Sequence, residues 1–220
     1  MALDMEPTPV GVDDDPMRGM LVSRNGDRAT TVIADPAPLG LTALAVTTVV
    51  FSLFNAGLLD RAGEPVLFGL AAVYGGVVQI LAGMWELRRG NAFGAVTFGS
   101  LGAFWLSLWV FEQFLRNQMP AGDVGNVLAM YFIVWAVISG SLWVASTRTT
   151  AAVSAMLALL TAALVLLGIG YAGAHSELIK IGGWVGLATA VVAWYAAFAG
   201  LINSTYKRTV LPLVPLGRAR

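Results

Sequence analysis

Residues 149–174 read TTAAVSAMLALLTAALVLLGIGYAGA, a run of 26 residues without a charged side chain. A helix that crosses the hydrocarbon core of a bilayer needs about 20 mostly apolar residues. Five further charge-free stretches of 21 to 26 residues share the chain, at 36–59, 65–85, 90–111, 124–147 and 181–206. We therefore expect an all-α integral membrane protein with six transmembrane helices.

The overall composition fits a chain that lies mostly in lipid. Hydrophobic residues make up 57% and charged residues 12% of the sequence, about half the charged share of a soluble domain. This balance argues against a soluble enzyme, a nucleic-acid binder with a basic face and an intrinsically disordered chain. The sequence has no cysteine and one histidine, His175, so it lacks the clustered ligands of a thiolate metal site or a bis-histidine haem. We expect no metal, no cofactor, no nucleic-acid partner and no enzymatic activity.

The links between the charge-free stretches differ in charge. Ten basic residues fall on one side of the predicted membrane, in both tails and in the links after the second and fourth stretches. The opposite side carries three, Arg61, Arg116 and Lys180. Basic residues favour the cytoplasmic side of a membrane. We therefore expect both termini in the cytoplasm, as an even number of spans requires, and a multi-pass protein of the inner or plasma membrane.

This layout divides the chain into three segments. Residues 1–34 carry nine charges, six of them acidic, and too little apolar surface to fold alone, so we expect a disordered cytoplasmic tail. A partner-binding role for its acidic cluster is the alternative. Residues 35–206 form the expected six-helix transmembrane domain. Residues 207–220 are expected to form a cytoplasmic C-terminal tail.

Small polar residues repeat along the first three predicted spans. Steps of three and four residues place them on one face of each helix. This polar stripe comprises Thr48, Ser52 and Asn55 in the first span, Gln79 in the second, and Thr97 and Ser100 in the third. A buried amide in a membrane needs a hydrogen-bond partner, so Asn55 and Gln79 must face another helix or water. The stripe fits two interpretations, polar contacts between packed helices and the wall of a narrow pore for a small polar solute.

Acidic side chains approach these spans at two positions, Glu86 and Glu112, each at the end of a charge-free stretch. A charge at the centre of a membrane helix costs roughly 2.5–3.5 kcal/mol. Ion pumps and most proton-coupled carriers accept this cost because they need a proton relay. Without such a relay, the chain is expected to pass a small solute rather than to react with it. Glu86 and Glu112 are the candidates for proton coupling.

A series of ordered motifs begins with Pro36, Ala37, Pro38, Leu39, Gly40 and Leu41, followed by Thr47-Thr48 and Asn55-Ala56-Gly57. It continues with Tyr74-Gly75-Gly76, Gln79, Ala82-Gly83, Glu86, Gly90-Asn91, Phe93-Gly94, Gly102-Ala103-Phe104-Trp105, Gly183-Trp184-Val185-Gly186 and Arg208-Thr209-Val210-Leu211-Pro212. In order and spacing these motifs resemble the acetate uptake transporter family, which includes the bacterial succinate–acetate permeases. The resemblance runs from about residue 34 to residue 213.

The resemblance implies a six-helix protomer that assembles as a homo-hexamer, each protomer with its own pore for acetate and related short carboxylates. Matched by position, Leu44, Leu101 and Leu160 would form the narrowest point of this pore. The chain departs from the family pattern because Asp35 replaces the usual Asn, and because Leu44 and Leu101 stand where Phe and Tyr are common. A leucine ring alters the width and apolarity of the neck, so acetate, propionate and succinate all stay open as the preferred solute.

The predicted function is transport of acetate and related mono- and dicarboxylates, linked to protons. The alternatives are a channel for another small solute such as ammonium, and a structural or regulatory subunit that does not transport. An anion would lose its hydration in a leucine neck, so the neutral acid is expected to cross. Uptake should then rise as the external pH falls. No single titratable side chain should set that slope, unless it is Glu86, Glu112 or Glu177.

Overall fold

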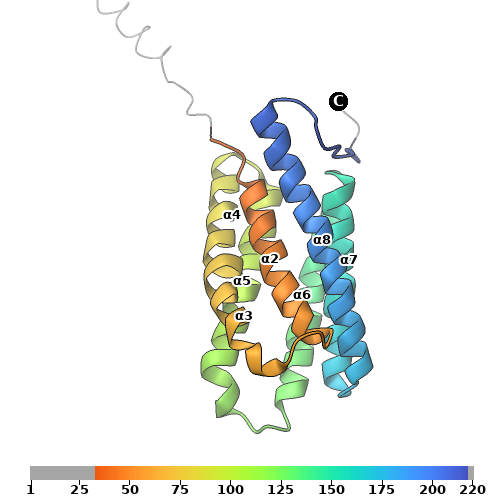
Figure 1. Cartoon of the computed structure of the whole chain (residues 1–220). Coiled ribbons are helices and arrows are strands. Elements are labelled where there is room, and N and C mark those ends of the chain that lie inside the picture. Colours follow the sequence, from red (N-terminus) through yellow and green to blue (C-terminus); the bar gives the residue numbers. More distant parts are fainter. Residues whose placement is uncertain (1–32, 218–220) are drawn as a thin grey trace, which may run out of the picture. The chain divides into compact units, whose positions relative to one another are not determined.

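The computed structural model describes residues 33–217, and the part it describes has six helical spans long and apolar enough to cross a membrane. They are Ala37–Asn55, Arg61–Arg88, Ala92–Gln118, Val124–Ser146, Ala151–Ala172 and Ser176–Tyr206. All six lie in one compact unit that begins at Asp35 (Figure 1). The predicted all-α, six-span fold is confirmed. The N-terminal tail that we expect to be disordered lies outside the described residues.

Four of the spans are single α-helices and two are composite. The single helices are α2 (Ala37–Asn55), α6 (Val124–Ser146), α7 (Ala151–Ala172) and α8 (Ser176–Tyr206). The second span joins the 3-10 turn η1 (Arg61–Gly63), α3 (Pro65–Leu70), the π-helical segment η2 (Ala71–Val78) and α4 (Gln79–Arg88). The third joins α5 (Ala92–Val110), the π-helical segment η3 (Phe111–Leu115) and the 3-10 turn η4 (Arg116–Gln118).

The predicted ends of the second and third spans were wrong. The charge-free stretches stop just before Glu86 and Glu112, but the helices continue through both residues. Each carboxylate has a partner that offsets the cost of leaving water. The Asn91 side-chain amide donates to Glu86 Oε2 over 2.8 Å, and Arg116 pairs with Glu112 over 2.5 Å. Both glutamates therefore belong to the helix bundle rather than to its links.

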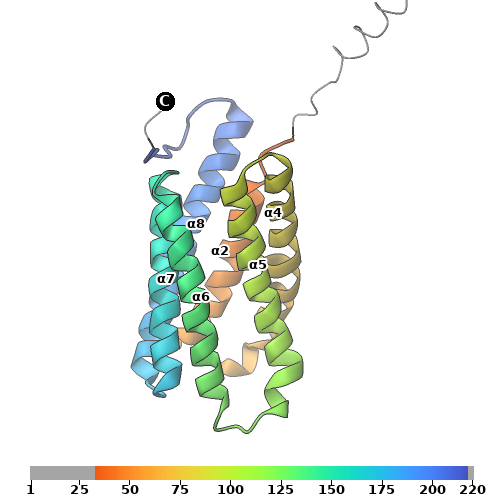
Figure 2. The same cartoon turned by 180° about the vertical axis from the view of Figure 1, so that it is seen from behind.

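The helices pack as two groups joined through α2. Helix α2 lies against α8 and against the second span, while α4 packs on α5 (Figure 1). Helices α6, α7 and α8 pack in sequence, and the view from behind shows α6 next to α5 (Figure 2). Side chains of α2, α5, α6 and α7 thus meet in a common core.

Glycines bring α4 and α5 into backbone contact. A Cβ atom on Gly83 would lie 2.8 Å from the Gly99 nitrogen, and one on Gly102 would lie 3.0 Å from the Gly76 carbonyl oxygen. Real Cβ atoms essentially never approach as closely as the first distance, and the second is tighter than most of their contacts, so a larger residue at either position would push the helices apart. Close contact of this kind is a common way for membrane helices to pack, because lipid provides no hydrophobic driving force between them.

The described part of the C-terminal tail folds back onto the bundle. After α8, Lys207 adopts a left-handed conformation with φ 52° and turns the chain. The Asn203 side-chain oxygen then accepts two backbone N–H groups, from Val210 and Leu211. Two backbone hydrogen bonds of 2.8 Å join residues 214–216 to residues 149–151. This returning segment therefore holds the link between α6 and α7.

Candidate solute pathway

A small cavity of about 20 Å³ lies within the bundle, between α2, α5, α7 and α8. We call it the central cavity, and its wall includes Thr48, Ser52, Phe104, Trp105, Leu160 and Gly186. Thr48 Oγ1 and Trp105 Nε1 are buried and have no hydrogen-bond partner among the described residues. A single water molecule needs roughly 10–15 Å³ of such space. The central cavity thus has room for a water-sized group, and two residues of its largely apolar wall carry an unpaired polar atom.

A second cavity, of about 220 Å³, lies at the end of the bundle where α2 begins. This Glu86 cavity is lined by Leu41, Glu86, Asn91, Thr97, Thr150 and Met156, among others. The Glu86 side chain is fully buried, and its Oε2 accepts the hydrogen bond from Asn91. Glu86 Oε1 and Thr97 Oγ1 have no hydrogen-bond partner in the described part of the chain. Two unpaired oxygens therefore belong to residues of this cavity wall.

A third cavity, of about 40 Å³, lies at the opposite end of the bundle. This Arg116 cavity is lined by Arg61, Glu64, Glu112, Arg116, Phe132 and Tyr171, among others. Phe51 lines both this cavity and the central cavity, so the two cavities are neighbours. The Phe51 ring centroid lies 5.6 Å from that of Trp105 and 6.0 Å from that of Phe132. Phe51 and Phe132 form an aromatic partition.

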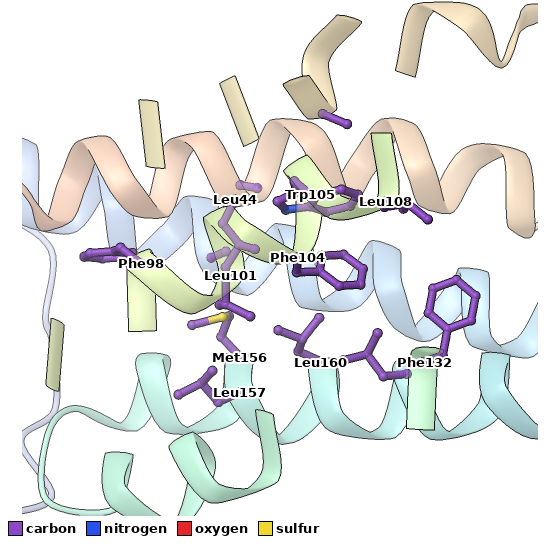
Figure 3. Packing of buried hydrophobic residues seen from close by; sticks show 14 of the residues in the cluster. Leu44, Phe98, Leu101, Phe104, Trp105, Leu108, Phe132, Met156, Leu157 and Leu160 are labelled. Atoms are coloured by element: carbon purple, nitrogen blue, oxygen red, sulfur yellow. The ribbon is translucent and has the colours of Figure 1, made fainter. Parts of the chain in front are cut away.

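The central cavity and the Glu86 cavity are separated by Leu44, Leu101 and Leu157, each at most 2% exposed. We call these three residues the leucine partition; Figure 3 shows them with Met156 in the buried cluster. Each lies about one helical turn from a residue of either cavity, so the wall residues of the two cavities are about two turns, or roughly 10 Å, apart along the helices. The triplets, from the Glu86 cavity to the central cavity, are Leu41–Leu44–Thr48, Phe98–Leu101–Trp105 and Val153–Leu157–Leu160.

The residues predicted to form the neck fall at two levels. Leu44 and Leu101 lie in the leucine partition and line none of the three cavities. Leu160 lines the central cavity, one turn from Leu157 on α7. All of them belong to one buried cluster (Figure 3). Leu157 thus completes the partition on α7, a position that the family pattern did not single out.

The polar stripe also divides. Thr48 and Ser52 line the central cavity, and Thr97 lines the Glu86 cavity. The other three members, Asn55, Gln79 and Ser100, line none of the three cavities. The structure therefore brings half of the stripe to the cavities and leaves half between helices.

Two of the remaining stripe residues differ in how their polar atoms are paired. The Tyr171 hydroxyl donates to Asn55 Oδ1 over 3.1 Å, and Asn55 Nδ2 donates to the Phe51 carbonyl over 2.9 Å. Gln79 is fully buried, and neither polar atom of its amide has a partner among the described residues. Asn55 thus does not line a cavity itself, but it binds Tyr171, whose side chain lines the Arg116 cavity.

The sequence patterns did not indicate the aromatic partition. Phe51 lies seven residues after Leu44 in the same helix, which is two turns along the same face. The polar stripe comprises only polar residues and therefore omits Phe51, although the helical spacing includes it. Phe132 gave no such signal, because it comes from α6, whose sequence is apolar on all sides.

Replacing Asn55 by leucine should lower acetate uptake about fivefold while the protein still inserts and assembles. The change removes the acceptor of the Tyr171 hydroxyl, a hydrogen bond worth roughly 1 kcal/mol, and so frees a side chain of the Arg116 cavity. Uptake into liposomes that contain equal amounts of each variant measures the effect. Tyr171→Phe removes the same bond from the other side and should behave alike. Wild-type rates in both variants would show that this contact only packs helices.

Six apolar spans around a series of cavities define a multi-pass membrane protein of the transporter or channel type. The chain belongs to the GPR1/FUN34/yaaH family, whose profile matches residues 19–218. It is 36% identical over 207 residues to acetate permease A of Emericella nidulans, an alignment that spans 85% of this chain and 70% of that protein. The predicted resemblance to acetate transporters is confirmed, and with it the location in the cell membrane.

Two bacterial comparisons add to this assignment. The chain is 32% identical over 183 residues to the succinate-acetate/proton symporter SatP of Escherichia coli strain K12, covering 83% of this chain and 96% of that one. The solved structure of the bacterial acetate channel SatP matches with a TM-score of 0.78 and 31% identity, over 83% of this chain and 99% of that chain. These relatives are transporters or channels by name, which agrees with the expected absence of an enzymatic role.

Proposed function

We propose that the chain moves acetate and related short carboxylic acids across the cell membrane through the three cavities. The central cavity carries this proposal, because Thr48 and Trp105, which carry the unpaired Oγ1 and Nε1 atoms, belong to its wall between two apolar partitions. Both groups donate hydrogen bonds, which suits the oxygens of a small carboxyl group. Neither has another partner among the described residues. The relatives are named as an acetate permease, a succinate-acetate/proton symporter and an acetate channel, which supports the same substrate class.

The leucine partition favours the neutral form of the acid. An ionised carboxylate pays a large desolvation cost in an apolar constriction, whereas the protonated form pays far less. Simple carboxylic acids have a pKa of about 4, so their neutral fraction grows as the pH falls toward that value. Uptake would therefore be linked to protons because the acid itself carries one through the partition.

Of the two candidates for proton coupling, Glu86 has the better position. Glu112 is paired with Arg116, so its carboxylate already has a partner. Glu86 Oε1 has no partner in the described part of the chain, and Glu86 lines the larger cavity. The charged groups near Glu86 are Arg89, 3.7 Å from its Oε2, and Asp35, which binds Arg89 over 2.6 Å. Glu86 would accept the proton of the acid after the acid has passed the leucine partition.

The charge distribution supports an orientation with the Glu86 cavity on the cytoplasmic side. Arg88, Arg89 and Arg148 belong to the end of the bundle that holds this cavity, as do the returning residues 207–217. The end that holds the Arg116 cavity is poorer in basic residues. The positive-inside preference then directs the Arg116 cavity outward, and both termini would be cytoplasmic.

The homo-hexamer is part of the same proposal. Large apolar side chains are exposed on the single protomer, among them Val137 and Val144 on α6 and Val191 and Leu201 on α8. Lipid or neighbouring protomers must cover them in a membrane. A particle mass of six chains in native mass spectrometry of the detergent-solubilised protein would support the hexamer, and a monomer would contradict it.

Labelled acetate uptake into liposomes that contain the full chain tests the proposed function. We expect acetate to enter faster than in protein-free liposomes, and benzoate at neutral pH to show no such excess, because its ring is too wide for the partitions. Methylammonium uptake distinguishes the alternative of an ammonium channel. Acetate rates equal to those of protein-free liposomes would contradict carboxylate transport and favour a subunit that does not transport.

A further inference from the structure

Two arginine–glutamate pairs face each other across the Arg116 cavity. One pair comes from the start of the second span, where Arg61 binds Glu64 over 2.8 Å. The other comes from the end of the third span, where Arg116 binds Glu112 over 2.5 Å. All four side chains line the same cavity. We call them the charge quartet.

The position of the quartet differs from that of an ordinary surface ion pair. Lys180 and Glu177 form a pair of 2.8 Å, but their side chains are 50% and 77% exposed. The two glutamates, Glu64 and Glu112, are only 22% and 10% exposed, whereas Arg61 and Arg116, at 52% and 44%, are about as exposed as Lys180. Their cavity shares Phe51 with the central cavity. Moving a charge out of water costs free energy that its attraction to an opposite charge does not fully offset. Such a cost at the mouth of a solute pathway indicates a binding role.

The two guanidinium groups have unused hydrogen-bond donors. An arginine carries five N–H groups in a planar fork. In the described part of the chain, Arg61 uses one nitrogen for Glu64 and another for the Tyr171 hydroxyl, 3.5 Å away. Arg116 uses one nitrogen for Glu112. Both retain N–H groups for a further acceptor, and a carboxylate is the group that matches the arginine fork best.

We propose that Arg61 and Arg116 form a receiving site for the carboxylate group of the transported acid. Its volume of about 40 Å³ corresponds to roughly three water molecules, which fits one carboxylate group. The quartet is neutral as a whole, so an incoming carboxylate takes the place of Glu64 or Glu112 on a guanidinium. It moves on toward the leucine partition after it has taken up a proton from the external water, so the neutral acid is still the form that crosses. This inference rests on the proposed function, since it assigns a subsite to the same solute.

The site belongs to one end of the pathway only. At the opposite end Arg89 binds Asp35 over 2.6 Å and lies 3.7 Å from Glu86. Arg89 is not among the residues that line the Glu86 cavity. The effect of removing an arginine of the quartet should therefore depend on the side from which acetate arrives.

The test measures labelled acetate flux into right-side-out and inverted membrane vesicles that contain the full chain. For Arg61→Gln and Arg116→Gln we expect the half-saturation concentration to rise about tenfold when acetate arrives at the Arg116 end, which corresponds to about 1.4 kcal/mol. From the other end the half-saturation concentration should not change, but the maximal rate should fall about tenfold, because the ratio of the two quantities must be the same in both directions of a passive pathway. The maximal rate from the Arg116 end should stay within a factor of about two. Lys180→Gln is the matched control, because Lys180 is a basic residue of the same end outside the cavity wall.

A single arginine variant leaves a glutamate unpaired, so a double variant is needed. Arg116→Gln combined with Glu112→Gln removes the whole pair and should show the same one-sided loss. A half-saturation concentration equal to that of the wild type, or an equal rise of this concentration from both ends, would overturn the receiving site. Saturation-transfer NMR on the acetate methyl signal measures binding separately from flux. Binding that depends on the arginines, without any flux, would support the site and refute the proposed transport. Flux together with binding that does not depend on the arginines would support the transport and refute the site.

Discussion

Shortening Leu101 to alanine should allow succinate to cross at a rate about tenfold above that of the wild type, equivalent to about 1.4 kcal/mol off the barrier. Leu101 is 2% exposed and lies in the leucine partition between the central and Glu86 cavities. The substitution removes three side-chain carbons from a constriction to which each of three helices contributes one leucine. Succinate is a suitable reporter, because its two carboxyl groups make it nearly impermeant through lipid. Initial uptake of labelled succinate into liposomes measures the change.

Truncating a buried leucine also lowers stability, by roughly 3–5 kcal/mol in soluble proteins, so the effect on the pathway needs a control. Leu142→Ala makes the same truncation at a 6% exposed position of α6 that lines none of the three cavities. It should leave the rate of succinate uptake at that of the wild type. Leu101→Val should widen the partition less and give a smaller increase. If Leu101→Ala keeps the solute range of the wild type, or if Leu142→Ala admits succinate equally, Leu101 does not limit the pathway.

The six spans could be predicted because lipid imposes a simple rule on the sequence. Every backbone polar group in the bilayer core must be paired, so long charge-free stretches can only be helices. The rule failed at Glu86 and Glu112, where the prediction treated a charge as the end of a helix. The helices continue through these residues because Asn91 and Arg116 bind the two carboxylates and offset part of the free-energy cost of removing them from water. Span ends are therefore less predictable than span number.

The cavities could be predicted only in part, because they depend on which helices meet. Helical spacing placed Thr48 and Ser52 on one face, and both line the central cavity. The same spacing placed Asn55 on that face, yet Tyr171 of α7 binds it, which no pattern within α2 could indicate. The charge quartet likewise joins residues more than 40 positions apart in the chain. In the sequence, each of its two pairs indicates only a local contact at the end of a helix.

Replacing Glu86 by glutamine should lower the initial rate of acetate uptake about tenfold, or about 1.4 kcal/mol, at every external pH, without changing the slope of rate against pH. Glutamine keeps an oxygen for the Asn91 amide but cannot accept a proton. If the neutral acid crosses the leucine partition, the external pH sets its concentration, and Glu86 acts only afterwards, when the acid releases its proton in the Glu86 cavity. Rates between about pH 5 and 7, with a pH-sensitive dye in the lumen, measure both effects.

The wild type should show uptake that rises as the pH falls and a lumen that acidifies as acetate arrives, because each neutral acid delivers one proton. Glu177→Gln is the control, since Glu177 is exposed and pairs with Lys180 away from the Glu86 cavity; it should match the wild type. A slope abolished by Glu86→Gln would mean that Glu86, rather than the acid, carries the coupling proton. A wild-type rate and a wild-type slope in that variant would show that Glu86 has no role in transport. A flat profile in the wild type would refute the passage of the neutral acid, because its concentration changes with pH whatever the side chains of the protein do.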